Sequence, residues 1–157
     1  MGWILLGVFV LIQFFRITKN QSSAVAVNSI TTKFSVPSTV QSVLKTSCYN
    51  CHSNNTDYPW YVNLQPVAWW LQSHVMDGKK HLNFDEFAGY TLRRQYNKFD
   101  EIKEMVEKDE MPLGSYTLIH RDAILSKEQK ELLINWSGQM MDTMKASYPP
   151  DSLKKQN

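Results

Sequence analysis

The two cysteines of the chain, Cys48 and Cys51, lie three positions apart, and His52 directly follows the second one. This C-x-x-C-H pattern is the attachment motif of c-type haem. Two thiols at this spacing can form thioethers with the vinyl groups on one edge of the porphyrin, while the next imidazole binds the iron. The motif therefore predicts one covalent haem c per chain, with His52 as the proximal iron ligand.

Three other uses of a C-x-x-C pair compete with this prediction. A zinc site needs a second pair of ligands at similar spacing, and the chain has no further cysteine. A thioredoxin-type redox pair opens a helix within a βαβ pattern, whereas here a helical pattern precedes the pair. A structural disulfide or a chance match is the remaining alternative.

The spacing of apolar residues predicts an all-α domain of about four helices separated by long loops, because no segment alternates like a β-strand. A first short helix after residues 37–39 delivers its C-terminal end to Cys48. A second follows Pro66 through residues 67–77, and Gly78 is predicted to end it in the left-handed conformation.

Two capping pairs predict where the later helices begin. Asn83 with Glu86 is expected to open one long or two short helices reaching about Glu107, and Ser126 with Gln129 to open the terminal helix. Residues 111–114 interrupt the pattern with Pro and Gly, so a loop is expected there.

The N-terminal stretch from Trp3 to Phe15 is apolar except for Gln13 and is closed by Arg16 and Lys19. It is shorter than the roughly 20 residues of a full membrane span, and residues 24–26 resemble a signal cleavage site. We expect an uncleaved N-terminal hydrophobic anchor helix. The predicted division is a signal-anchor or transmembrane segment at 1–19, a tether at 20–33, a haem-binding domain at 34–148 and a polar tail at 149–157.

The second axial ligand of the iron is predicted to be Met111, because it lies in a loop and Pro112 stiffens the approach. His74 on the second helix is the alternative ligand, although it can equally bond a haem propionate or a backbone carbonyl. Met111 as a core gap-filler stays open as well. The pocket around the haem is expected to contain six aromatic or histidine side chains, each of which can instead be plain core: Trp60, Tyr61, Trp69, Trp70, His74 and Tyr116.

Several motifs together resemble a known family. They are CYNCHSNNTDYPWY at 48–61, PVAWWLQSHV at 66–75, GKKHLNF at 78–84, MPLGSYTLIHRDAILS at 111–126 and Trp136. The chain resembles the small bacterial haem-binding-domain proteins related to monohaem cytochromes c. This resemblance implies a cytochrome c-like fold around one haem, a Met-Pro ligand loop, and assembly outside the cytoplasm. The chain departs from the family pattern at Lys79, where Arg is common, and at Phe87, where Trp is common.

The expected function is single-electron transfer by a haem domain in the periplasm, anchored to the inner membrane through the N-terminal segment and serving redox partner proteins. The positive-inside rule argues for the opposite orientation, since Arg16 and Lys19 follow the apolar run, but the haem motif overrules it. The alternatives are an open-coordination haem sensor or peroxidase, and a haem-bearing accessory subunit of a membrane complex.

Other functional classes find no support in the sequence. A net charge of +2 identifies no partner, and nucleic acid is not expected. The chain has no Gly-rich phosphate loop and no hydrolytic constellation, and nothing indicates a small-molecule substrate. These features favour an electron carrier over an enzyme.

Overall fold

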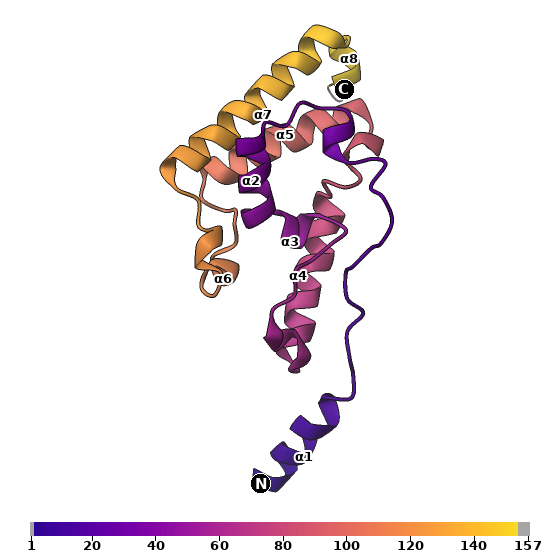
Figure 1. Cartoon of the computed structure of the whole chain (residues 1–157), viewed down its shortest axis with the longest axis vertical. Coiled ribbons are helices and arrows are strands. Elements are labelled where there is room, and N and C mark those ends of the chain that lie inside the picture. Colours follow the sequence, from indigo (N-terminus) through magenta and orange to yellow (C-terminus); the bar gives the residue numbers. More distant parts are fainter. Residues whose placement is uncertain (1, 154–157) are drawn as a thin grey trace. The chain divides into compact units, whose positions relative to one another are not determined.

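The computed structural model describes residues 2–153, and within that range the regular secondary structure is entirely helical, with no β-strand. The α-helices, shown in Figure 1, are α1 (Gly2–Ile12), α2 (Ser38–Ser47), α3 (Tyr49–His52), α4 (Val67–His81), α5 (Leu92–Glu107), α6 (Gly114–Thr117), α7 (Lys127–Ser147) and α8 (Pro150–Leu153). Short 3₁₀ turns are η1 (Ile30–Thr32), η2 (Trp60–Asn63), η3 (Phe87–Gly89) and η4 (Arg121–Ala123). The predicted all-α class is confirmed, and the helices expected in the domain correspond to α2, α4, α5 and α7.

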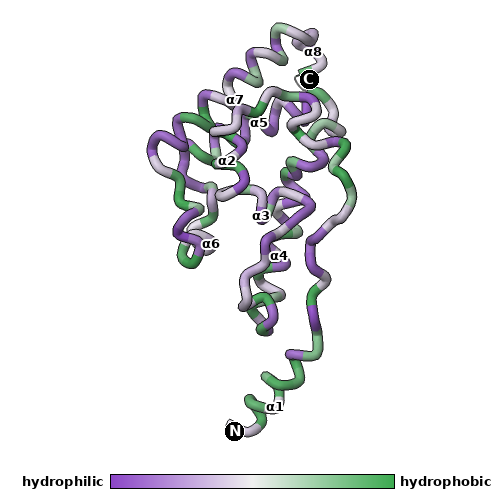
Figure 2. The backbone as a smooth tube through the Cα atoms, viewed as in Figure 1, coloured by the Kyte–Doolittle hydropathy of each residue, from purple (hydrophilic) through white to green (hydrophobic). Residues whose placement is uncertain are grey.

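The N-terminal helix corrects one expectation. Helix α1 is apolar along its length (Figure 2) but only 11 residues long. No helix between residues 2 and 153 combines the length and the hydropathy that crossing a membrane requires. The prediction of an N-terminal anchor helix is therefore wrong. The helix ends at Ile12, and the side-chain oxygen of the next residue, Gln13, accepts a hydrogen bond from the Gln65 N–H at 2.9 Å.

The chain divides into two compact units. Unit 1 contains residues up to Ala24 together with Asn50–Asn83, and unit 2 contains Val25–Tyr49 together with the chain from Phe84 onward. Each unit is thus built from two separate stretches of sequence. The residues predicted as a tether are shared between the units, 20–24 in unit 1 and 25–33 in unit 2.

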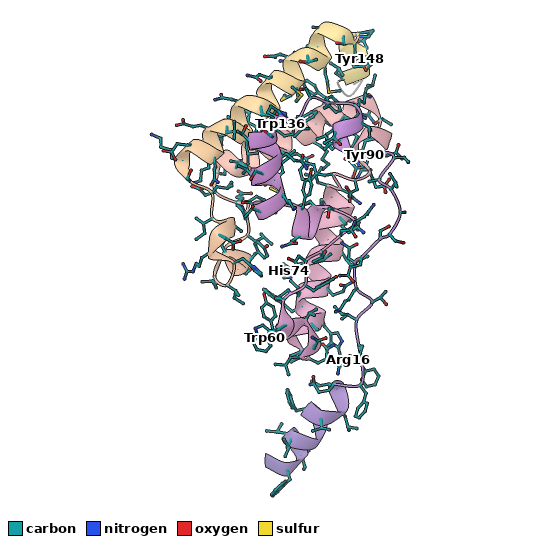
Figure 3. The ribbon with its side chains drawn as sticks, in the orientation of Figure 1. Arg16, Trp60, His74, Tyr90, Trp136 and Tyr148 are labelled. Atoms are coloured by element: carbon teal, nitrogen blue, oxygen red, sulfur yellow. The ribbon has the colours of Figure 1, made fainter. Side chains whose placement is uncertain are left out.

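Unit 2 is built on helices α5 and α7, which lie side by side, with α2 and α8 packed against them (Figure 1). Its centre is a group of aromatic rings. Phe99 lies 5.0 Å from Phe34 and 5.5 Å from Trp136, measured between ring centroids, both in edge-to-face geometry. Such pairs contribute about 0.5–1.5 kcal/mol beyond their buried area. The Trp136 indole, labelled in Figure 3, donates to the Ser35 carbonyl at 3.1 Å, so no buried donor is lost.

Of the two capping pairs that the sequence predicts, one is confirmed. Ser126 and Gln129 form the predicted capping box of α7. The predicted start at Asn83 is wrong, because α5 begins at Leu92 with Thr91 as its cap. Tertiary bonds hold the intervening chain out of a helix: the Phe84 carbonyl accepts from the Ile30 N–H at 2.8 Å.

Unit 1 is organised around helix α4 and has a small apolar cluster of Val62, Ala68 and Leu71. The N-terminal stretch adds hydrogen bonds to it. The guanidinium of Arg16 donates to the Asn63 carbonyl at 2.6 Å, and the Gln65 side chain donates to the Phe15 carbonyl at 2.9 Å. Residues 13–20 therefore form part of the packed unit, attached where α4 begins.

Gly78 does not end helix α4, contrary to the sequence prediction. The helix continues to His81, and no glycine in the described chain has positive φ. The glycine is needed for a different reason, which lies in the contact between α4 and the cysteine motif described below.

Candidate functional site

The C-x-x-C-H motif follows helix α2, as the sequence predicted. Cys48 is the residue after the last turn of α2, and its N–H donates to the Leu44 carbonyl at 2.9 Å. Helix α3 carries Cys51 and His52, and all three motif side chains are half-buried. The boundary between the two units falls after Tyr49, so Cys51 and His52 belong to unit 1.

The ring of His52 is held in one tautomer. Its Nδ1 lies 2.9 Å from the backbone oxygen of Leu82. A carbonyl only accepts hydrogen bonds, so Nδ1 carries a proton, and in the neutral ring Nε2 carries the lone pair. Metal-binding histidines typically donate their other ring N–H to a carbonyl in this way, which fixes the ring and raises the basicity of the ligand atom. The His52 side chain therefore meets the chemical requirement for an iron ligand.

Helix α4 packs directly against the motif, and Gly78 allows this approach. A Cβ atom at position 78 would lie 2.7 Å from the carbonyl oxygen of Cys51 and 3.1 Å from its Cβ. The nearest atom belongs to the backbone, which has little freedom to move away. Only glycine fits here, and the close packing brings the end of α4, with Leu82, to His52.

Burial raises the pKa of the Cys51 thiol. In the part of the chain that the structure describes, no three His, Cys, Asp or Glu side chains gather as a metal site.

The predicted pocket residues fall in three places. Trp60 and Tyr61 lie in η2, with ring centroids 5.9 Å apart, and the Trp60 side chain is 81% exposed. Trp69 and Trp70 lie on α4 and are both exposed. Tyr116 is on α6 in unit 2, where its ring stacks on that of His120 at 4.3 Å.

Some of these aromatic residues already have structural partners. The indole of Trp69 donates to the Phe15 carbonyl at 3.1 Å, which ties this ring to the N-terminal stretch. Trp70 contacts the ring of His74 at 4.4 Å between centroids. Their roles toward a haem stay predictions.

The candidates for a second axial ligand differ in their surroundings. His74, labelled in Figure 3, is half-buried on α4, and its Nδ1 donates to the Trp70 carbonyl at 2.8 Å, so it has the same tautomer as His52. Met111 is half-buried in unit 2, with its N–H bonded to the Met105 carbonyl at 3.2 Å. Met76 and His81 are exposed.

Sequence reasoning missed three residues near the motif. Leu82 acts through its backbone, and Gly78 was interpreted as a helix stop. Asn20, whose side chain donates to the Ser53 carbonyl next to His52 at 3.0 Å, was placed in a tether. Only Gly78 left a signal in the sequence, as a glycine in a stretch that otherwise favours helix.

An all-helical chain that holds a C-x-x-C-H histidine with its Nε2 lone pair fixed has the properties of a haem protein. Comparison with protein families agrees: the model of the haem-binding domain family matches residues 7–139. The chain belongs to this family. Searches of curated proteins and of solved structures found no match to the chain.

Proposed function

We propose that this haem-binding protein is a c-type cytochrome. Cys48 and Cys51 hold one haem through thioether bonds, His52 binds the iron, and the protein transfers single electrons outside the cytoplasm. The observation that carries the proposal is the 2.9 Å hydrogen bond from His52 Nδ1 to the Leu82 carbonyl. This bond orients the ring of the residue next to the second cysteine and makes Nε2 the ring nitrogen that can bind a metal.

The residues around His52 would tune its strength as a ligand. Bound haem supplies a reversible one-electron iron couple, and the basicity of the axial ligand helps to set its potential. The Leu82 carbonyl lies at the C-terminal end of α4, where the helix dipole places partial negative charge. This end of the helix favours positive charge on the imidazole and so makes Nε2 a stronger donor. The proposed result is a stabilised oxidised state.

We propose Met111 as the second axial ligand, with His74 as the alternative. Pro112 restricts the backbone next to Met111, and a thioether ligand raises the potential relative to a second histidine. His74 is supported by its fixed tautomer. The location outside the cytoplasm and the redox partner proteins are proposed because the motif is that of c-type haem attachment.

Covalent attachment can be tested by extracting non-covalent haem with acidic acetone and measuring the haem that stays on the protein. We expect one haem per wild-type chain and none on the Cys48→Ala, Cys51→Ala double variant. His81→Ala is a control, because this exposed residue lies outside the motif. Equal covalent haem on the double variant would refute the proposal.

The axial ligands can be tested by absorption spectra of the oxidised and reduced protein, with and without carbon monoxide. A low-spin spectrum with the sulfur-to-iron band and no response to carbon monoxide supports a closed His/Met carrier. Met111→Ala should remove that band, whereas His74→Ala should leave it unchanged. A high-spin wild-type spectrum that responds to carbon monoxide would instead indicate ligand sensing or peroxide chemistry.

A further inference from the structure

Two residues of the N-terminal stretch hold the loop that directly follows His52. The Ser22 N–H donates to the Asn55 side chain at 2.8 Å, and Asn20 makes several further bonds. The side-chain nitrogen of Asn20 donates to the Ser53 carbonyl at 3.0 Å and to the Thr56 hydroxyl at 2.9 Å. Its backbone carbonyl accepts from the Thr56 N–H at 2.9 Å. Ser53 and Thr56 are both buried, with 3% and 5% exposure. The turn after the histidine is therefore bonded at both ends to one asparagine.

The same asparagine reaches helix α4. Its side-chain oxygen accepts from the ammonium group of Lys79, and its N–H donates to the Tyr58 hydroxyl at 2.9 Å. That hydroxyl in turn donates to the Gln72 side chain at 3.0 Å. Every donor and acceptor group of Asn20 is thus used, and two of these connections end on α4, the helix that supplies the Leu82 carbonyl.

A further bond continues the network into the motif helix. The Thr56 hydroxyl donates to the backbone oxygen of Asn50 at 2.7 Å, between the two cysteines. One chain of hydrogen bonds therefore runs from Asn20 through Thr56 to α3, and another runs from Asn20 through Lys79 to α4. These are the two elements whose relative position sets the His52–Leu82 distance.

We infer that Asn20 is a positioning residue for His52, and that residues 13–22 are a structural part of unit 1, which contains Cys51 and His52. The inference rests on the proposed haem site. Asn20 does not touch the ligand atoms; it acts by holding α3, the following loop and α4 in register. Losing the group that bonds directly to a metal ligand typically costs about 10–100-fold in affinity or activity. Asn20 acts one step further out, so the lower end of this range is expected.

The first test compares Asn20→Ala with Gln21→Ala, a neighbouring exposed residue whose N–H bonds only to the Lys19 carbonyl. The readouts are covalent haem per chain, the midpoint potential, and the electron paramagnetic resonance spectrum of the ferric protein, which reports the orientation of the axial imidazole. We expect about tenfold less covalent haem in Asn20→Ala, with a shifted spectrum and potential in the loaded fraction. Gln21→Ala should match the wild type.

The outcomes separate this inference from the proposed function. If the wild type carries no covalent haem, the proposed function fails. If the wild type is loaded and Asn20→Ala has the same haem content, spectrum and potential, this inference alone is overturned. Should Asn20→Ala not fold, Lys79→Met decides: it removes one bond of the network, and an unchanged spectrum and potential would overturn the inference.

The mass of the natural haem-loaded protein gives an independent test. A chain cleaved at residues 24–26 would lack Asn20 and the whole network. We expect the loaded protein to retain Asn20. A mature protein that begins after residue 22 and still binds haem normally would overturn the inference.

Discussion

The two units of this protein differ in the size of their apolar cores. Unit 2 has a core of packed aromatic rings between α5 and α7, with Phe87 and Phe99 fully buried. Unit 1 has a small apolar cluster around Leu71, and polar side chains such as Asn20 and Gln65 connect its loops. Apolar burial tolerates small shifts, whereas hydrogen bonds depend on direction. Under the proposed function, the unit that orients His52 is thus the one whose loops rely on directional contacts.

The largest expected effect is in the core of unit 2. Phe99→Ala should lower the free energy of unfolding by about 3–5 kcal/mol, since it empties the space between three other rings. Urea denaturation followed by circular dichroism measures this. Because this loss comes from apolar burial in unit 2, the drop in the free energy of unfolding should be similar with and without haem. A loss below about 1 kcal/mol would contradict the view that packed aromatic rings stabilise unit 2.

The next effect concerns the contact between α4 and the motif. Gly78→Ala should destabilise the protein by about 1–3 kcal/mol, because the new methyl group meets the Cys51 carbonyl. It should also reduce covalent haem. Thermal unfolding and haem content are the measurements.

Gly138→Ala is the matched control, since Gly138 also lies within a helix, α7, with no atom within 4 Å of the added Cβ. It should stabilise the protein by up to about 1 kcal/mol through helix propensity. Equal effects from the two substitutions would mean that the close approach of α4 to Cys51 does not contribute to stability.

A smaller effect is expected at the start of α7. Ser126→Ala removes the capping box and should cost about 1 kcal/mol. Thr91→Ala, which removes a single long bond of 3.3 Å at the start of α5, should cost less. Chemical denaturation of both variants gives the comparison, and the reverse order would contradict it.

The smallest effect concerns a buried hydroxyl in the core of unit 2. The hydroxyl of Ser137 is buried on α7 and has no hydrogen-bond partner. Ser137→Ala should therefore change the unfolding free energy by less than about 0.5 kcal/mol or stabilise the protein. A clear destabilisation, measured by denaturation, would show that this hydroxyl contributes to the core.

Much of the fold follows from local signals. The apolar spacing after Pro37 and Pro66 predicted α2 and α4, and Ser126 with Gln129 predicted the start of α7. The pair at Asn83 and Glu86 failed, because the carbonyl of Phe84 bonds to Ile30, far away in the sequence. Capping signals are local, and a distant partner can replace the helix that they favour.

The helical class, the helices α2, α4 and α7 and the C-x-x-C-H motif could all be predicted from the sequence, since periodicity and spacing act within a few residues of chain. Folding was needed to explain why Gly78 is a glycine, which carbonyl fixes the His52 ring, and why Asn20 belongs to the unit that contains His52. Each of these depends on atoms that folding brings together from 27 to 33 positions apart in the sequence. No local pattern encodes such a contact.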